Sequence, residues 1–336
     1  MKRIVRNLMT LLSFLVISCS LLDGRQIRIN LGTIAPQGSS AHQALLIMRD
    51  VWRQAPEGGV RLVIYPNGVQ GGEADMVRLM RIDLLQAGLF TAVGISKIEP
   101  GVSALQNMPM VFRSLEEYDF VSKRLRPKLE ARIEEQGYIV LFWVDAGWIR
   151  FFSKTPLVYP DDLLAMKLFV WAGSHGQANI LTSMGFHPVM LETADIVPGL
   201  QTGLIDSVAL PPIYALATQT DIRAPYMLEL NYAPLMGAAL IRKATWERIP
   251  TGAQKILRDS AKNAGKQINT KARSESNESV KAMEKRGLKV QKVTPDIERV
   301  WIERAEAIYP RIRGTEVPED VFDEVIRLLG EFRSDN

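Results

Sequence analysis

Cysteine and histidine are scarce in this 336-residue sequence, which has one cysteine, Cys19, and three histidines, His42, His175 and His187. A single cysteine excludes an intrachain disulfide and any zinc site built from several thiolates. No two histidines stand at the spacing typical of metal ligands. We therefore expect no resident metal and no other cofactor.

Motifs that hold a nucleotide or activate a nucleophile are also missing. The sequence contains no G-x-G-x-x-G, no G-x-x-x-x-G-K-[ST] and no G-x-S-x-G, so it indicates neither a phosphate-binding loop nor a nucleophile elbow. An enzyme would need an acid–base pair in a cleft, and the best available pair is Glu73 with His42 or Asp206. That pair is poor, so we expect a protein that is not an enzyme.

Positive charges outnumber negative charges only slightly in this sequence. The formal net charge is +4, and Lys2, Arg3 and Arg6 lie within the first eighteen residues, which contain no acid. Without these three residues the net charge falls to about +1. The basic isoelectric point therefore comes largely from the N-terminus, and we expect no nucleic-acid partner.

Long apolar runs are missing except near the N-terminus, where a basic start precedes an apolar run from Leu8 to Ile17. This run has the length of a signal peptide and is too short to span a bilayer. The run ends in Val16-Ile17-Ser18-Cys19, which fits a bacterial lipobox. The sequence predicts a lipoprotein signal peptide over residues 1–19, lipidation of Cys19 and a periplasmic protein held on a membrane. The alternative is ordinary cleavage near Ser18 or Ser20, and the choice between inner and outer membrane stays open.

The remaining sequence alternates between strand and helix patterns. Residues 27–31, 60–65, 138–144, 148–153 and 166–171 have the patterns of strands, with amphipathic helices between several of them. Because the order strand–helix–strand recurs in both halves, the sequence predicts an α/β fold with two lobes. From Thr251 to about Arg286 the spacing predicts one helix of about 50 Å, which would run across both lobes.

Five segments occur in an order and spacing that are specific in combination: Leu31–Ser40, Tyr65–Glu73, Met108–Phe112, Pro156–Val170 and Leu200–Asp206. Over roughly residues 25–290 they resemble the solute-binding subunit of TRAP transporters, the DctP-like periplasmic receptors. The resemblance implies a two-lobed periplasmic-binding-protein-like fold, with a long helix spanning both lobes and a ligand between them. We expect lobe I over residues 25–148 plus about 235–265. Lobe II would span 149–234 plus about 266–336, including the C-terminal helices.

The sequence departs from the family pattern at three positions. Phe169 and Ile149 stand where well-studied members carry a carboxylate-binding arginine, and Leu210 stands where a polar residue is usual. Arg150 is adjacent, but strand alternation would place it on the opposite face. A buried carboxylate needs a fixed cation, so these changes argue against a dicarboxylate or sialic-acid ligand.

The residues expected to contact the ligand are mostly large and apolar. They are Trp148, Ile149, Phe169, Trp171, Leu210, Pro211 and Tyr214, with Glu73 and Asn67 as polar contacts. Such a set favours a hydrophobic or amphipathic ligand. In the alternative, these residues fill a core and a polar ligand is held by Glu73, Asn67 or Gln201.

The sequence thus predicts an extracytoplasmic receptor that captures a small apolar or amphipathic solute and delivers it to TRAP membrane permease subunits. In lacking this arginine, the sequence also resembles the TRAP subtype that works with a TPR-repeat lipoprotein. Such a lipoprotein would be a further partner. One alternative is an organic-acid receptor of the same class, in which Arg150 or another arginine turns into the cleft. A second is an enzyme on a similar two-lobed fold. Hinge motion is expected near residues 145–150 and 234–238.

Overall fold

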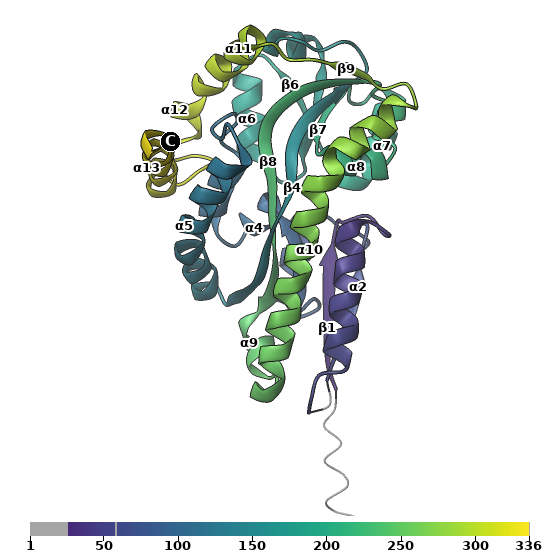
Figure 1. Ribbon diagram of the computed structural model, residues 1–336, viewed down its shortest axis with the longest axis vertical. Helices are drawn as coiled ribbons and strands as arrows, with labels where there is room; N and C mark the ends of the chain where they lie inside the picture. The colour runs from purple at the N-terminus through teal and green to yellow at the C-terminus, as the bar shows by residue number, and fades with distance from the viewer. Residues whose placement is uncertain (1–25, 58, 336) are drawn as a thin grey trace, which may run out of the picture.

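The computed structural model describes residues 26–57 and 59–335 (Figure 1). The predicted signal peptide over residues 1–19 and the lipidation of Cys19 lie outside this part of the chain. Within the part described, no helix combines the length and the apolar character needed to cross a membrane. The same residues contain no group of three or more His, Cys, Asp and Glu side chains that could hold a metal ion.

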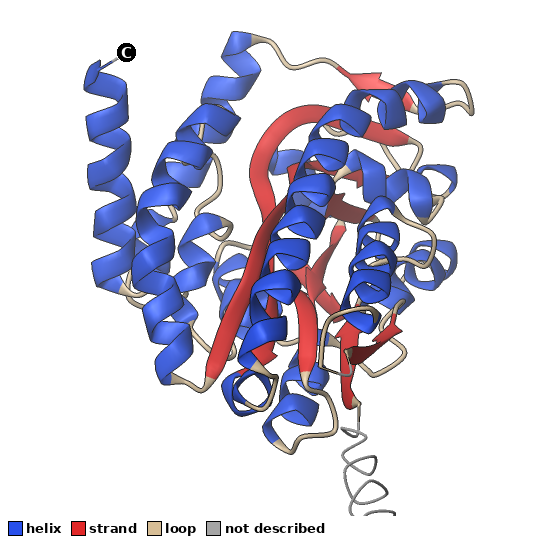
Figure 2. Ribbon diagram, turned by 60° about the horizontal axis from the view of Figure 1, so that its bottom comes forward, coloured by secondary structure: helices blue, strands red, loops and turns tan. Residues whose placement is uncertain are grey.

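The strands of the described residues form one nine-stranded sheet. Their order is β2 (Val60–Tyr65), β1 (Ile27–Thr33), β3 (Ala87–Thr91), β8 (Tyr226–Arg242), β4 (Tyr138–Ser153), β7 (Ser207–Leu210), β5 (Lys167–Trp171) and β6 (His187–Leu191), and β9 (Lys289–Gln291) pairs with β8. Strand β1 is parallel to β2 and β3, and β5 is parallel to β6 and β7. Figure 2 shows the strands running through the middle of the molecule with helices on either side. The predicted α/β class is confirmed.

The long antiparallel strands β4 and β8 connect the two ends of the sheet. The sequence pattern predicted two strands, 138–144 and 148–153, where the structure has the single strand β4. The interruption is a shift of register between Asp145 and Trp148. Within it, Gly147 has a φ of 74°, which is in the left-handed region that favours glycine. A second shift follows between Ile149 and Phe151, so simple alternation does not describe this stretch of β4.

We call the part built around β1, β2 and β3 the first lobe. Its helices are α2 (Ser40–Arg53), α3 (Glu73–Arg81), α4 (Ala92–Ile95), η1 (Pro100–Leu105) and α5 (Leu115–Glu135). Helix α2 begins where the Ser39 side chain accepts a hydrogen bond from the backbone of His42. It buries Leu45, Met48 and Trp52, which lie on one face at helical spacing.

The second lobe is built around β5, β6 and β7. Its shorter helices are η2 (Pro160–Ala165), α6 (His175–Ser183), η3 (Thr193–Asp195), α7 (Ile196–Thr202), α8 (Pro212–Ala217) and η4 (Thr220–Ile222). Its core contains Phe152, Phe169, Leu200 and Met227, which are buried together.

After β8 and α9 (Lys243–Glu247), helix α10 (Thr251–Glu284) has 34 residues, and it contacts α2 in the first lobe and α8 in the second. Figure 1 shows it crossing in front of the long strands. The predicted helix that spans both lobes is therefore present. Gly265 permits its close approach to β4, because an added Cβ atom there would lie 2.8 Å from the Cβ of Phe142.

The C-terminal helices divide between the lobes. Helix α11 (Pro295–Glu306) packs Trp301 beside Phe151 of the second lobe, with ring centroids 5.3 Å apart. After α12 (Tyr309–Ile312), helix α13 (Glu319–Asp335) packs on α5, where Arg333 pairs with Glu117 at 2.7 Å. The last helix thus lies against the first lobe, whereas we predicted residues 266–336 to belong to lobe II. The other predicted lobe boundaries remain predictions.

Candidate ligand-binding site

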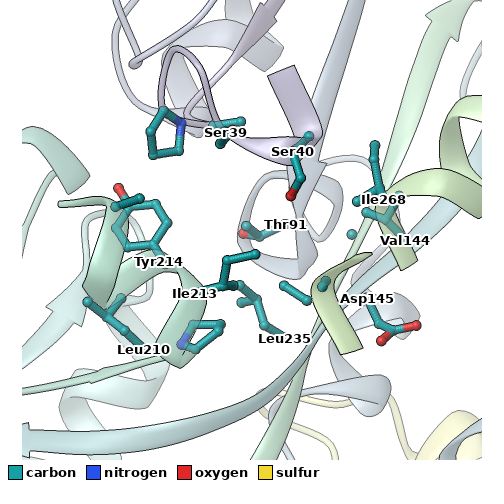
Figure 3. Close-up of a pocket in the computed structure, with 18 of the residues that line it drawn as sticks. Ser39, Ser40, Thr91, Val144, Asp145, Leu210, Ile213, Tyr214, Leu235 and Ile268 are labelled. Carbon is teal, nitrogen blue, oxygen red and sulfur yellow. The ribbon is translucent and has the colours of Figure 1, made fainter. Parts of the chain in front are cut away.

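A cavity of about 530 Å³ lies between the two lobes. The first lobe contributes the ends of β1 and β3 and the start of α2, and the second lobe contributes Leu210 and α8. The middle of β4 and β8 and one flank of α10 complete the wall. Figure 3 shows labelled side chains from both lobes, from the two long strands and from α10 around a common space. The cavity is therefore placed where two lobes could enclose a small molecule.

Most of the wall is apolar. Larger apolar side chains come from both lobes, from the long strands and from α10, among them Leu89, Val144, Leu210, Ile213, Leu235 and Ile268. The uncharged polar side chains are few, namely the hydroxyls of Thr33, Ser39, Ser40, Thr91, Tyr214 and Ser279 and the indole of Trp171. Such a wall can bury apolar area and offers a small number of hydrogen bonds to fix orientation.

All charged side chains among the described residues that line the cavity are acidic. They are Asp145, Glu275 and Glu278, and the described part of the chain adds no lysine or arginine to the wall. Asp145 is 1% exposed and is neutralised by Arg273, whose Nε and Nη2 donate to its two carboxylate oxygens at 2.9 Å. Figure 3 shows the Asp145 carboxylate turned away from the apolar side chains. The wall therefore supplies no cation for an anionic ligand.

Tyr214 lines the cavity and carries a neutral hydroxyl. Burial raises the pKa of Tyr214 above its ordinary value of 10.0, and the charge of Glu73 raises it further. The hydroxyl consequently stays protonated at neutral pH and can donate or accept a hydrogen bond.

Glu73 is used inside the first lobe. Its carboxylate accepts hydrogen bonds from the Thr91 backbone nitrogen and hydroxyl, both at 2.6 Å, and from the Gly94 nitrogen at 2.9 Å. It therefore satisfies backbone groups at the start of α4. Burial nevertheless raises the pKa of Glu73 above 4.5, because it outweighs the opposing effect of these hydrogen bonds. Glu73 lies behind the wall and does not line the cavity.

The nine residues predicted to contact the ligand lie at different places. Trp171, Leu210, Pro211 and Tyr214 line the cavity. Asn67 lines a smaller crevice of about 190 Å³ that also touches Tyr214, and its Oδ1 accepts from the Gln37 nitrogen at 2.7 Å. A contact of these residues with a ligand remains a prediction.

Trp148, Ile149 and Phe169 do not line the cavity. Trp148 packs against the core of the first lobe, and Ile149 is buried in β4. Phe169 lies in the core of the second lobe, where its ring contacts that of Trp171 with centroids 4.9 Å apart. Phe169 therefore lies behind Trp171, which is the β5 residue that lines the cavity.

Arg150 is buried and also does not line the cavity. Its nearest carboxylate is that of Glu229, 3.8 Å away, and its Nε and Nη1 atoms have no hydrogen-bond partner. Burial lowers the pKa of Arg150, and Glu229 opposes this effect. A guanidinium with unused donors is therefore enclosed in the second lobe, beside the strand that carries Leu210.

Several cavity residues were not foreseen from the sequence. Ser39 and Ser40 end the Leu31–Ser40 segment that carries the family resemblance, but neither they nor Ile268 was predicted to contact the ligand. No sequence pattern indicated that Ile213 and Leu235 line the cavity, because this depends on how α8 and the middle of β8 are placed relative to each other. The uninterrupted apolar spacing toward Ile268 could have suggested that α10 forms one wall.

Comparison with known proteins identifies the family. The model of the bacterial extracellular solute-binding proteins, family 7 (DctP), matches residues 31–315. The C4-dicarboxylate-binding periplasmic protein DctP of Rhodobacter capsulatus is 24% identical over 238 residues, which cover 68% of this chain and 69% of that protein.

Solved TRAP periplasmic solute-binding proteins have the same fold. One from Sulfurospirillum deleyianum with bound succinate has a TM-score of 0.82 at 17% identity, covering 90% of this chain and 99% of that chain. One from Xanthobacter autotrophicus with bound β-D-galacturonate has a TM-score of 0.80 at 18% identity with the same coverage. The two-lobed fold and the family expected from the sequence are confirmed. The chain therefore belongs to the DctP family of bacterial extracellular solute-binding proteins, and it is a periplasmic solute receptor of the TRAP class rather than an enzyme.

Proposed function

We propose that this receptor captures a small hydrophobic or amphipathic solute between its lobes and delivers it to TRAP membrane permease subunits. The observation that carries the proposal is the composition of the cavity wall, which among the described residues is largely apolar and contains acidic but no basic side chains. Burying 100 Å² of apolar ligand surface there would contribute about 2.5 kcal/mol. Desolvating a carboxylate without a cationic partner would instead cost several kcal/mol.

The known ligands of relatives favour a second candidate, an organic acid. The curated relative from Rhodobacter capsulatus binds C4-dicarboxylates, and the solved relatives hold succinate and β-D-galacturonate. An organic acid would need a cation here, and Arg150 is the available candidate because two of its nitrogens are unpartnered. Arg150 would have to leave Glu229 and turn toward the cavity for this candidate to hold.

Replacing Ile213 by serine separates the two candidates. Ile213 lines the cavity, whereas Ile222 is 53% exposed outside it, so Ile222→Ser is the matched control. Calorimetry on ligand-free receptor would compare medium-chain alcohols and fatty acids with succinate and galacturonate. For an apolar solute we expect Ile213→Ser to weaken binding about tenfold, since roughly 1.4 kcal/mol of apolar burial is lost.

The organic-acid candidate makes the opposite prediction. Succinate or galacturonate would bind, Arg150→Leu would abolish that binding, and Ile213→Ser would change it little. This pattern would contradict an apolar ligand while leaving the receptor function of the family intact.

We also propose that the receptor is anchored to a membrane through lipidated Cys19, on the lipobox that Val16–Cys19 form. Cell fractionation should find the receptor with membranes, and Cys19→Ser should remove it from them, while Ser20→Ala should not. Recovery of the unchanged receptor in the soluble periplasmic fraction would indicate ordinary signal cleavage instead.

The TPR-repeat lipoprotein remains a proposed further partner, supported by the absence of a family arginine at Phe169 and Ile149. Affinity purification of the anchored receptor would test it. A TPR-repeat protein should be recovered together with the permease subunits, and recovery of the permease alone would contradict this partner.

A further inference from the structure

A second hollow, of about 480 Å³, lies on another flank of α10, away from the ligand cavity. Helices α5 and α10 form its sides, and the first half of β4 forms its floor. Figure 1 shows these two helices on either side of the lower part of β4. We call this hollow the basic groove, and its residues are Arg126, Glu130, Val140–Trp143, Arg258, Lys262, Lys266, Asn269 and Thr270.

Four cations converge on the basic groove. Arg258, Lys262 and Lys266 follow one another at intervals of four residues on α10, so they form one stripe along the helix. Arg126 faces them from α5. The stripe extends over about 12 Å, given a rise of about 1.5 Å per residue.

None of these four cations forms an ion pair within the described part of the chain, and the two arginines among them lie over the rings of Trp246 and Trp143. None of them has a carboxylate oxygen within 4.0 Å, in contrast to neighbouring Lys255, which pairs with Asp259 at 2.7 Å. Glu130, the one acid in the wall, accepts a hydrogen bond from the Trp143 indole at 2.6 Å. The buried Nε atom of Arg126 has no hydrogen-bond partner. The groove therefore combines concentrated positive charge with an unused donor.

This arrangement is unfavourable for the protein alone. Like charges one turn apart repel and destabilise a helix. A bound anion would remove that repulsion, and guanidinium groups in particular bind phosphate oxygens through paired hydrogen bonds.

We propose that the basic groove binds a phosphate-bearing anion that carries several negative charges. The length of the cationic stripe fits an extended anion better than a single phosphate group, because the charges are distributed over about two helical turns. Several linked phosphate charges occur both in a soluble oligophosphate and in a phospholipid headgroup with more than one phosphate. This inference does not rest on the identity of the solute in the ligand cavity, since none of the four cations lines that cavity.

Titration calorimetry with sodium tripolyphosphate tests the proposal on the full chain in neutral detergent. The groove variant is Lys262→Gln with Lys266→Gln. The matched control is Lys271→Gln with Lys281→Gln, because both residues are exposed on the same helix outside the groove. We expect saturable binding that the groove variant weakens roughly tenfold or more and the control variant leaves unchanged.

A second arm distinguishes the two sources of the anion. Cardiolipin, whose headgroup carries two phosphates, should compete with tripolyphosphate when added to the detergent micelles if a lipid headgroup occupies the groove, and should not compete if the natural anion is soluble. Either result agrees with the proposal as long as the groove variant alone loses binding. Absence of tripolyphosphate binding, or equal loss in the groove and control variants with unchanged melting temperatures, would overturn it.

Discussion

Asp145 illustrates how single residues near the cavity are stabilised. Its carboxylate is buried in β4, and Arg273 of α10 pairs with it while also pairing with Asp119 of α5 at 2.6 Å. The Asp145 backbone nitrogen donates to the Asn269 side chain at 2.9 Å. Arg273 thus connects β4 with α5 and α10.

We expect Arg273→Met to destabilise the protein by about 3 kcal/mol, because it leaves a buried carboxylate without its partner. Urea unfolding would measure the change in the free energy of unfolding. Arg299→Met is the control, since the pair between Arg299 and Asp296 is exposed and should contribute less than about 1 kcal/mol. Adding Asp145→Asn to Arg273→Met should restore part of the loss, and equal effects of both arginine changes would contradict this account.

At the scale of elements, the approach of α10 to β4 depends on a glycine. An added methyl group at Gly265 would meet three atoms of the Phe142 side chain within 3.0 Å. The helix must therefore move outward, or Phe142 must adopt another conformation, before a larger residue fits.

Gly265→Ala should accordingly destabilise the protein by about 1–3 kcal/mol, although alanine is the better helix former. The matched control is Gly330→Ala in α13, where an added methyl group has open space. This control should stabilise the protein by about 0.5–1 kcal/mol through helix propensity. Thermal unfolding of both variants measures the difference, and stabilisation by both changes would show that α10 is not tightly packed on β4.

The elements themselves were largely predictable from local patterns. The spacing of apolar residues predicted the helix from Thr251 to about Arg286, and the structure has it at Thr251–Glu284. The pattern could not show that β4 is continuous, because the register shift around Gly147 interrupts the alternation. It also could not place α13 against the first lobe, since that contact joins segments roughly 200 residues apart, as in the pair between Glu117 and Arg333.

The candidate site was predictable only in part, for the same physical reason. The sequence pattern predicted three cavity residues, Leu210, Pro211 and Tyr214, because they lie at or just after the end of one strand. Phe169 and Ile149 were chosen by their family positions, and the structure buries them away from the cavity wall. Which face of a strand borders the cavity depends on register and on the packing of the lobes.

At the scale of the whole molecule, the two lobes meet directly. Lys97 of the first lobe donates to the Gly173 carbonyl of the second at 2.7 Å. Glu192 of the second lobe lies so close to Gly72 that an added Cβ atom would meet its carboxylate at 2.1 Å. The contact brings Glu192 near another acid, Asp75 of α3.

Lobe contact should therefore depend on pH. Burial, and then the charges of Asp75 and Asp195, raise the pKa of Glu192 above its ordinary value of 4.5. Since a raised carboxyl pKa favours the protonated form in the closed molecule, closure should strengthen as pH falls toward 4.5 and weaken as pH rises through the raised pKa. Ligand affinity measured by calorimetry should follow this trend. Glu192→Gln should flatten it and tighten binding at neutral pH, whereas an unchanged pH dependence in this variant would contradict the assignment to Glu192.

The most direct test of the central claim is mass spectrometry of the organic-solvent extract of the purified receptor. The apolar, cation-free wall of the cavity predicts a stoichiometric hydrophobic or amphipathic metabolite in that extract. Recovery of a small dicarboxylate or a sugar acid bound in the native receptor would contradict the claim and establish the organic-acid candidate.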